Sequence, residues 1–273
     1  MKINTNVVAK MMVGNLSKVN DKASTAMQRL SSGLKINSAK DAPAGIAIAN
    51  KLNAQVQGLK QASQNVMNGI EMVQATEGAL NEVHDMLSRI KELGVQIQNG
   101  TYNEQDKKNA KEEINSLIDQ IQEIGQGTEY NKMSLLNGAS DVVFQIGANA
   151  DQSVTLKTDE LNIKNITDCV KDFRNSDVDH LPTNICEQIE NAIQKTSAIR
   201  GKLGAVQNRL EHISNNLGVS EENMTSSLSR IQDADMAEEM TNYTNNNIIA
   251  QAGISMLAQA NQRPQQVLQL LNS

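Results

Sequence analysis

The sequence predicts a mainly α-helical protein, built as an elongated antiparallel coiled-coil rod of helices with a small β-hairpin region. Three observations indicate this fold class. The 273 residues are 39% apolar and only 2% aromatic, with 3 Pro, so the bulky side chains of a thick globular core are missing. Apolar residues recur every three or four positions in both halves, as in helices that pack along narrow seams. One short stretch instead alternates apolar and polar residues, which is the period of a strand.

The first helix is expected to end at Ser31-Ser32-Gly33. Its apolar or small positions follow a spacing of three and four: Met12, Leu16, Val19, Ala23, Ala26 and Leu30. Asp41 then offers a side chain that can cap the next helix, with Pro43 just inside it, where a backbone N–H is not needed.

A long helix is expected over residues 44–99, because one apolar row repeats at seven-residue intervals: Leu52, Leu59, Val66, Val73, Leu80 and Leu87. Such a helix is about 80 Å long and turns this seam toward a partner. Several glycines within it lower its intrinsic stability, so packing against other helices must hold it.

The middle of the chain predicts a helix over 103–124, ended by Gly125-Gln126-Gly127. A β-hairpin is expected near 141–157, because Val142, Phe144 and Ile146 occupy every second position and Val154 and Leu156 do so again. The acidic segment near 158–190 is interpreted, as far as Pro182, as a linker or surface loop.

The last part of the chain carries the most regular seam, which fits a helix lying antiparallel to the long one: Ile185, Ile189, Ala192, Thr196, Ile199, Leu203, Val206, Leu210, Ile213 and Leu217. A final helical stretch is expected from about residue 223. Its interior is predicted to be small and amidic: Ile249, Ala252, Met256, Ala260, Val267, Leu270 and Leu271.

Charge and hydropathy exclude several classes of function. Residues 1–60 hold nine Lys or Arg and two Asp, but these charges are spaced singly and lack interleaved aromatic residues, so nucleic-acid binding is not expected. No apolar run is long enough to cross a membrane, and none follows Lys2 as a cleaved signal would. Membrane insertion is therefore not expected, and any export uses a route without such a signal.

The residue inventory predicts no catalytic site, cofactor or metal. The three histidines occur in no HExxH motif, and neither a P-loop nor a GxGxxG motif is present. The acidic run at 233–239 is interpreted as the solvated or interface face of a continuing helix, which spreads its carboxylates instead of converging them on a cation. Cys169 and Cys186 have no CxxC spacing and are interpreted as free thiols.

Several motifs at the two ends of the chain are specific in combination. The N-terminal ones are MKINTN at 1–6, RLSSGLKINSAKD at 29–41, AGIAIA at 44–49 and EGAL at 77–80. The C-terminal ones are LGAVQNR at 203–209, SRIQDAD at 229–235, QAG at 251–253, LAQANQ at 257–262 and PQ at 264–265. Through these motifs the chain resembles bacterial flagellin, the subunit of the flagellar filament. The resemblance spans both ends in the expected order and most of the chain.

The resemblance implies a D0 coiled-coil domain from residues 1–43 plus 235–273 and a D1 helical rod from 44–234, without large outer D2 and D3 domains. It implies a secreted structural protein that polymerises into a helical homopolymer and is exported by the flagellar type III apparatus. Its implied partners are other copies of the chain, an export chaperone at the C-terminal helix, and the filament cap and hook-junction proteins. The filament-core contacts are expected from the terminal stripes: Met12, Leu16, Val19, Leu30, Ile249, Ala252, Met256, Ala260, Val267 and Leu270.

The resemblance also implies recognition of the D1 surface by Toll-like receptor 5. The family patch corresponds here to LSRIKELGVQ at 87–96 and a glutamate on the next helix, and it also serves D1 assembly: Leu87, Arg89, Ile90, Glu92, Leu93, Gln96 and Glu113.

Three alternatives stay open. A hook–filament junction protein shares flagellin-like ends but forms no long homopolymer. A flagellin-borne enzyme needs a catalytic insert that this chain lacks. A soluble four-helix coiled-coil protein fits the seams but not the motifs.

Overall fold

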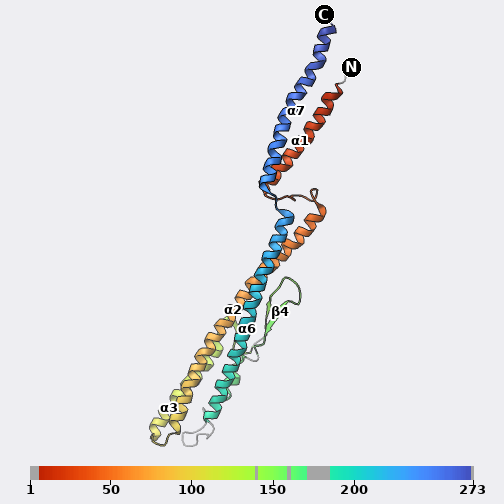
Figure 1. Ribbon diagram of the computed structural model, residues 1–273. Helices are drawn as coiled ribbons and strands as arrows, with labels where there is room; N and C mark the ends of the chain where they lie inside the picture. The colour runs from red at the N-terminus through yellow and green to blue at the C-terminus, as the bar shows by residue number, and fades with distance from the viewer. Residues whose placement is uncertain (1–5, 139–140, 159–160, 171–184, 272–273) are drawn as a thin grey trace. The chain divides into compact units, whose positions relative to one another are not determined.

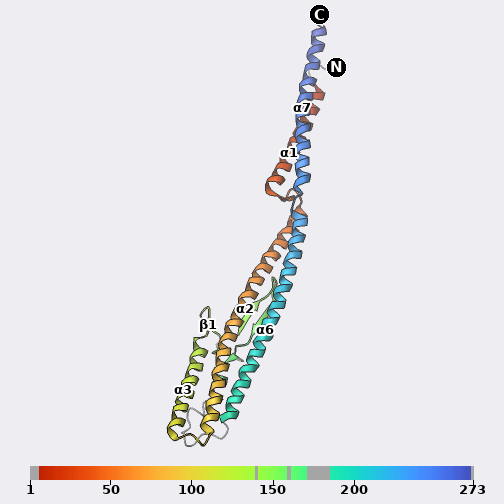
Figure 2. The same cartoon turned by 60° about the vertical axis from the view of Figure 1, so that its left-hand side comes forward.

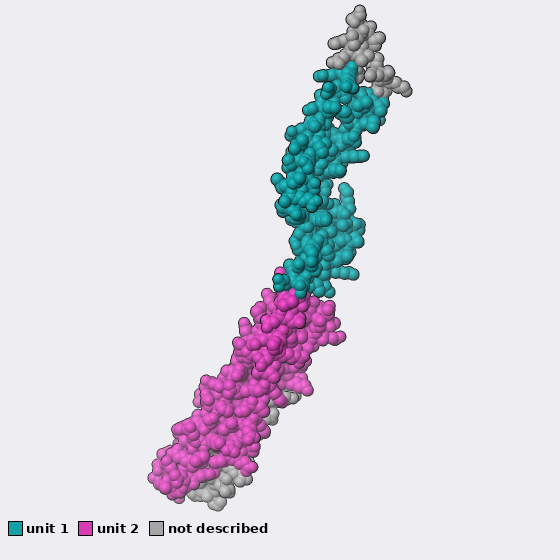
Figure 3. All heavy atoms as spheres, in the orientation of Figure 1, with its two compact units in different colours: residues 1–56, 222–273 teal, residues 57–221 magenta. Residues whose placement is uncertain are grey.

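The computed structural model describes residues 6–138, 141–158, 161–170 and 185–271, and their side chains except at 165, 185 and 264–271. The chain divides into two compact units (Figure 3). Unit 1 contains residues 1–56 and 222–273, and unit 2 contains residues 57–221. Unit 1 therefore combines the two ends of the chain, whereas unit 2 is formed by its middle.

Unit 1 contains an antiparallel pair of helices, α1 (Val7–Ser32) and α7 (Met236–Leu271), with both termini at the same end of the pair (Figure 1). Asn6 fixes this end. Its Oδ1 accepts from the Ala9 N–H at 3.1 Å and caps α1, while its Nδ2 donates to the Ala260 carbonyl at 3.0 Å. At the other end of α1, Gly33 adopts φ +72°, a left-handed conformation that ends the helix as the sequence predicts.

The two helices meet along a seam that the sequence predicts correctly on α1, whereas on α7 only Ala260 among the described predicted residues lies in it. On α1 the predicted stripe is half-buried against α7, and Ala26 is fully buried. On α7 the predicted interior residues Ile249 and Met256 are 53% and 51% exposed, and Ala252 is exposed too. The face that packs on α1 instead contains Ala250 and Gly253 together with these half-buried residues: Tyr243, Asn246, Leu257 and Ala260.

Small side chains explain this shift on α7. An added Cβ at Gly253 would lie 3.4 Å from Leu16 Cδ1, which is van der Waals contact, so the α7 backbone lies close to the Leu16 side chain here. The apolar residues Ile249 and Met256 consequently lie on the outer side. Val267, Leu270 and Leu271 lie outside the described side chains.

Two connecting segments of unit 1 pair with each other. Leu34 and Asp233 form an antiparallel bridge, the Lys35 N–H donates to the Gln232 carbonyl at 2.7 Å, and the Ala234 N–H donates to the Gly33 carbonyl at 2.9 Å. Helix α6 (Ile185–Gln232) therefore continues past residue 223, where a new helical stretch was predicted, and stops because residues 233 and 234 enter this bridge.

The acidic run 233–239 contains a helix start, so its interpretation as a face of one continuing helix is wrong. Asp235 Oδ1 accepts from the N–H groups of Ala237 at 2.9 Å and Glu238 at 3.3 Å, which caps α7. Asp233 belongs to the bridge and Glu239 to the first turn of α7, so these carboxylates serve different local structures.

Helix α2 (Pro43–Gln98) begins at Pro43 as predicted, but Asp41 does not cap it. Ala42 occupies that position, and its carbonyl accepts from the Ile46 N–H at 2.9 Å. Asp41 Oδ2 instead accepts from the N–H groups of Ser38 at 3.1 Å and Asn37 at 3.2 Å. These backbone donors, Ser38 first, hold the pKa of Asp41 below its ordinary value.

Unit 2 is built on α3 (Glu104–Gly127) and on the parts of α2 and α6 between residues 57 and 221, which lie side by side in both views (Figures 1 and 2). Glu77 pairs with Arg200 and Lys91 pairs with Glu190, so α2 and α6 run antiparallel, as predicted. The predicted seven-residue row is confirmed: Val66, Val73, Leu80 and Leu87 are at most 1% exposed. The α6 seam meets them with Ala192, Leu203 and Leu210, each fully buried.

Two hairpins lie in unit 2. The predicted one is confirmed as β3 (Val142–Gln145) paired antiparallel with β4 (Ser153–Leu156), with Phe144 opposite Val154. The sequence reading missed β1 (Glu129–Tyr130) and β2 (Met133–Ser134). Their two-residue turn places Asn131 and Lys132 at φ +50° and +63°, and Asn is among the residues that tolerate this conformation.

The described part of the acidic segment is no surface loop. Leu161, Ile163, Ile166 and Val170 are at most 4% exposed and join the core of unit 2 through the short helix α4 (Lys164–Thr167). An added Cβ at Gly125 would lie 3.0 Å from the Ile163 side chain, so this glycine serves close packing inside α3, which ends only at Gly127. Residues 171–184 lie outside the described residues. No described helix is both long and apolar enough to cross a membrane.

Candidate assembly and recognition surfaces

Exposed apolar side chains are concentrated in unit 1. Among the described residues, twelve of the eighteen exposed large hydrophobic residues belong to it, although unit 2 is the longer segment of chain. Eleven of the twelve lie on α1 and α7 with exposed fractions from 47% to 67%: Val7, Val8, Met11, Val13, Met27, Met236, Met240, Ile248, Ile249, Ile254 and Met256. We call these residues the outer apolar face of α1 and α7.

This helix pair has almost no core of its own. Among its described residues only Ala26, Glu239 and Ala250 are buried, and two of these are alanines. A helix pair of this kind gains little stability from burial, because helical stability in proteins comes mainly from packing an apolar face. The contacts that would stabilise the pair must therefore be supplied from outside it.

One ion pair joins the two helices at a site that sequence reasoning did not find. Arg29 Nη1 lies 2.8 Å from Glu239 Oε1, and the side chains are 28% and 11% exposed. The residues are 210 positions apart in the chain, and no local spacing in the sequence relates them. The pair fixes the alignment of α1 on α7 near the bridged connecting segments.

A second surface lies on α2 and α3 of unit 2. Arg89 Nε and Nη2 both donate to Glu113 Oε1, at 3.1 and 3.0 Å, and Nη1 donates to Glu92 Oε2 at 3.0 Å. These bonds, with Glu92 first and Glu113 next, raise the pKa of the Arg89 guanidinium above its ordinary value. Arg89 remains 51% exposed, so it is a fixed positive charge on the surface between two carboxylates.

The predicted patch is not one continuous exposed surface. Leu87, Ile90 and Leu93 are at most 2% exposed, because they carry the α2 seam that packs in the core. Arg89, Glu92, Gln96 and Glu113 are exposed, and we call these four residues the Arg89 surface.

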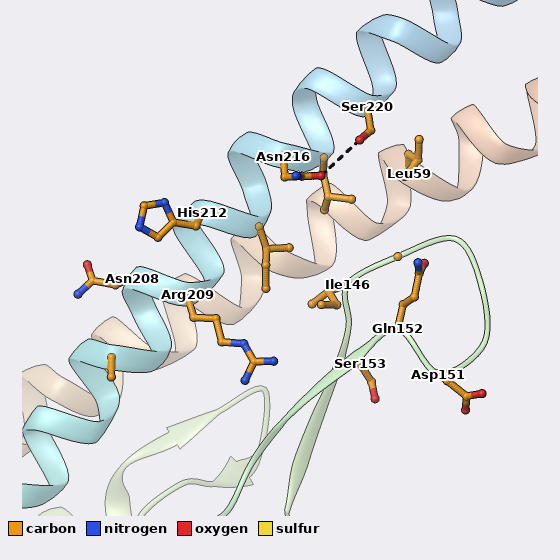
Figure 4. A pocket seen from close by; sticks show the side chains of 14 residues that line it. Leu59, Ile146, Asp151, Gln152, Ser153, Asn208, Arg209, His212, Asn216 and Ser220 are labelled. Atoms are coloured by element: carbon orange, nitrogen blue, oxygen red, sulfur yellow. Dashed lines mark hydrogen bonds between the residues drawn. The ribbon is translucent and has the colours of Figure 1, made fainter.

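A shallow groove of about 970 Å³ lies between α6 and the β3–β4 hairpin (Figure 4). Asn208, Arg209 and His212 line it from α6, and the Arg209 guanidinium points toward the hairpin side. Its floor is apolar, with Leu59 and Ile146. Figure 4 shows His212 pointing away from the hairpin that carries Asp151 and Ser153, and none of the predicted assembly or receptor residues lines the groove.

The cysteines are free thiols, as predicted. Lys195 Nζ donates to Cys169 Sγ at 3.1 Å, and Cys186 Sγ donates to Gln98 Oε1 at 3.8 Å. Within the described part of the chain, no cluster of three or more His, Cys, Asp or Glu side chains is arranged to hold a metal ion.

Two family models match the chain. The bacterial flagellin N-terminal helical region matches residues 3–141, and the bacterial flagellin C-terminal helical region matches residues 186–271. The chain belongs to the bacterial flagellin family. Only residues 142–185 separate the two matched regions, so this flagellin is a minimal form without a large central domain.

Similar proteins cover the chain almost completely. The flagellin of Bacillus subtilis is 42% identical over an alignment of 303 positions that covers 99% of this chain and 100% of that protein. The flagellin of Halalkalibacterium halodurans is 42% identical over 272 residues, again 99% and 100% of the two chains. The 33 kDa core protein of the flagellar filament of Treponema phagedenis is 37% identical, with the same coverage.

Solved structures agree with the fold. The crystal structure of Bacillus cereus flagellin has a TM-score of 0.51 and 27% identity, covering 56% of this chain and 88% of that one. A structure from Vibrio parahaemolyticus assigned as a flagellar hook-associated protein has a TM-score of 0.56 and 16% identity, covering 71% of this chain and all of that one. At that identity the second match concerns the fold alone.

Proposed function

We propose that this flagellin is a structural subunit that polymerises into the bacterial flagellar filament for motility, and that it is not an enzyme. The observation that carries the proposal is the outer apolar face of α1 and α7. A concentration of exposed apolar side chains on one helix pair indicates a site of association. Full-length similarity to flagellins and to a core protein of a flagellar filament supports the same conclusion.

The occupant of this face is a second copy of the chain. The helix pair lacks a core, so neighbouring copies supply the apolar contacts that one copy cannot make for itself. When identical subunits associate through two different surfaces, they form a ring only if the rotation between neighbours adds up to a full turn. Otherwise they form a helical polymer. We assign residues 1–43 plus 235–273 as the D0 assembly domain and residues 44–234 as the D1 domain.

Before assembly, the same face needs protection. We propose that an export chaperone covers the outer side of α7, where Ile248, Ile249 and Ile254 are 53–59% exposed. Export by the flagellar type III apparatus then delivers the chain to the filament tip, where the cap protein guides its addition. The hook-junction proteins present complementary ends to the first subunits.

Polymerisation of outer-face variants tests the proposal. In the variant Ile249→Ser with Met256→Ser, neither residue contacts the α1 seam, so the monomer should keep its helical content but fail to elongate filament seeds. Val219→Ser is the matched control, because Val219 is 60% exposed on α6 in unit 2. Unchanged elongation by the double variant would refute the role of the outer face.

We also propose that the Arg89 surface is recognised by Toll-like receptor 5. Arg89 is held by Glu92 and Glu113 in one exposed arrangement, so little side-chain entropy is lost when a partner binds it. Recognition through this surface involves the exposed residues, while Leu87, Ile90 and Leu93 support it from the core.

A further inference from the structure

We propose that Asn99 is a site of spontaneous covalent modification, at which the side-chain amide is lost through a cyclic imide formed with the backbone nitrogen of Gly100. The site does not depend on the proposed filament function. It rests on the conformation of the turn between α2 and α3 and on the chemistry of an Asn-Gly pair in that turn.

The turn holds the reacting groups together. Asn99 and Gly100 are exposed and follow the last residue of α2, and the Asn99 N–H donates to the Gln96 carbonyl at 3.2 Å. The Asn99 side chain folds forward along the chain, because its Oδ1 accepts from the Thr101 N–H at 3.2 Å. This bond holds the Asn99 side chain close to the peptide group of Gly100, which lies between Asn99 and Thr101. Nothing lies within 4 Å of the position where a Cβ of Gly100 would be, so no group beyond its chain neighbours crowds that side of Gly100.

The same hydrogen bond favours the reaction. When the Gly100 nitrogen attacks Cγ, negative charge develops on Oδ1, and the Thr101 N–H already points at that oxygen. The Gly100 N–Cγ bond forms, the Cγ–Nδ2 bond breaks, and ammonia leaves with the proton that the Gly100 nitrogen has lost. One water molecule then opens the imide. Attack at Cγ gives aspartate, and attack at the backbone carbonyl carbon gives isoaspartate; no electrons are exchanged with a redox partner.

The sequence supplies an internal comparison. Asn-Gly also occurs at Asn137-Gly138, where Gly138 has φ +68°, and at Asn68-Gly69. Asn68-Gly69 is the comparison for Asn99-Gly100, because it lies in the middle of α2. There the backbone is held by helix hydrogen bonds, and an added Cβ at Gly69 would lie 3.1 Å from the Phe144 ring, so this peptide group is packed as well as rigid. The nitrogen of Gly69 cannot turn toward Cγ of Asn68 without opening the helix. The two pairs have the same chemistry and opposite structural settings.

The product changes the turn. The reaction places a carboxylate beside the C-terminal end of α2, where the helix dipole is negative and the last turn contains no basic residue. Isoaspartate also lengthens the backbone by one methylene. Both effects loosen the last turn of α2 and its connection to α3.

Incubation of the full-length chain at neutral to mildly alkaline pH, followed by peptide mass mapping and an isoaspartate assay, tests the site. The expected result is conversion of Asn99 while Asn68 stays intact, and similar conversion of both when the chain is unfolded in urea. Gly100→Ala, which has open space for its methyl group, should slow the conversion, and Asn99→Gln should remove it. Equal conversion of Asn68 and Asn99 in the folded chain, or an Asn99 that stays intact as long as Asn68, would overturn the proposal.

Discussion

Arg29 Nη1 lies 2.8 Å from Glu239 Oε1 and thereby ties the last turn of α1 to the first turn of α7. Glu239 is 8% exposed overall, which makes it the one charged residue among the buried described residues. Removing the charge leaves the Arg29 guanidinium half-buried without its anionic partner, and charge-assisted hydrogen bonds are among the stronger ones.

Glu239→Gln should therefore destabilise the α1–α7 pair by about 1–2 kcal/mol. The loss is measured from the hydrogen exchange of α1 and α7 amides. The control is Glu221→Gln, which removes a longer ion pair to Lys60, at 3.8 Å with 63% of the lysine side chain exposed. Such surface pairs contribute roughly 0–1 kcal/mol. Equal losses in the two variants would contradict the role given to Arg29–Glu239.

Because Asp41 accepts hydrogen bonds as a carboxylate, we predict that the stability of the loop before α2 depends on pH. The folded-state pKa of Asp41 is lowered by the N–H groups of Ser38 and Asn37. The stability that it contributes is fully present above the unfolded-state carboxyl pKa of about 3.9 and is lost as the pH falls through the lower folded-state pKa. NMR should show the Asn37 and Ser38 amides losing protection in that acidic range, and Asp41→Asn should remove the dependence. Full protection at pH values below the folded-state transition would argue against these hydrogen bonds.

Gly58 and Gly78 predict opposite effects of the same substitution in one helix. An added Cβ at Gly58 would lie 2.7 Å from Ala148 Cβ and 3.3 Å from its Cα, because the β3–β4 loop packs closely on α2. At Gly78 nothing lies within 4 Å. Gly58→Ala should destabilise unit 2 by about 1–3 kcal/mol through overpacking, and Gly78→Ala should stabilise it by about 0.5–1 kcal/mol through helix propensity. Urea unfolding measures both, and a stabilising Gly58→Ala would show that the loop does not press on α2.

Arg89→Asp should weaken activation of Toll-like receptor 5, because it replaces the exposed positive charge by a third carboxylate beside Glu92 and Glu113. Lys91→Asp makes the same charge change two residues further along α2, where the lysine pairs with Glu190 on α6 instead. A reporter-cell dose response compares them. If Arg89→Asp leaves the response unchanged, or if Lys91→Asp lowers it equally, the Arg89 surface is not the recognised site.

The long seams could be predicted from the sequence because repeating apolar residues determine which helix face is buried. Val66, Val73, Leu80 and Leu87 repeat in register, and packing follows that register directly. The β3–β4 hairpin could also be predicted, because Phe144 and Val154 belong to stretches with apolar residues at every second position. In both cases, the spacing of apolar residues within one helix or strand determines which of its faces is buried.

The remaining features depend on contacts between distant residues. On α7, Ala250 and Gly253 face α1 while Ile249 and Met256 point outward, and hydrophobicity alone assigns these roles the other way round. The residues Leu161 to Val170 enter the core because Gly125 leaves room for Ile163, a match that no local spacing reveals. The break between α6 and α7 requires the bridge from Leu34 to Asp233, which joins segments from opposite ends of the chain.

Seeded polymerisation of the purified full-length chain, followed by electron microscopy and hydrogen exchange, tests whether the chain assembles into filaments through the outer apolar face. Short filament fragments serve as seeds, with a precipitating salt as the second condition. We predict long uniform filaments in which the α1 and α7 amides exchange hydrogen more slowly than in the monomer, because neighbouring copies cover the outer apolar face. Monomers or short capped oligomers under every condition would contradict it and would favour a hook–filament junction role.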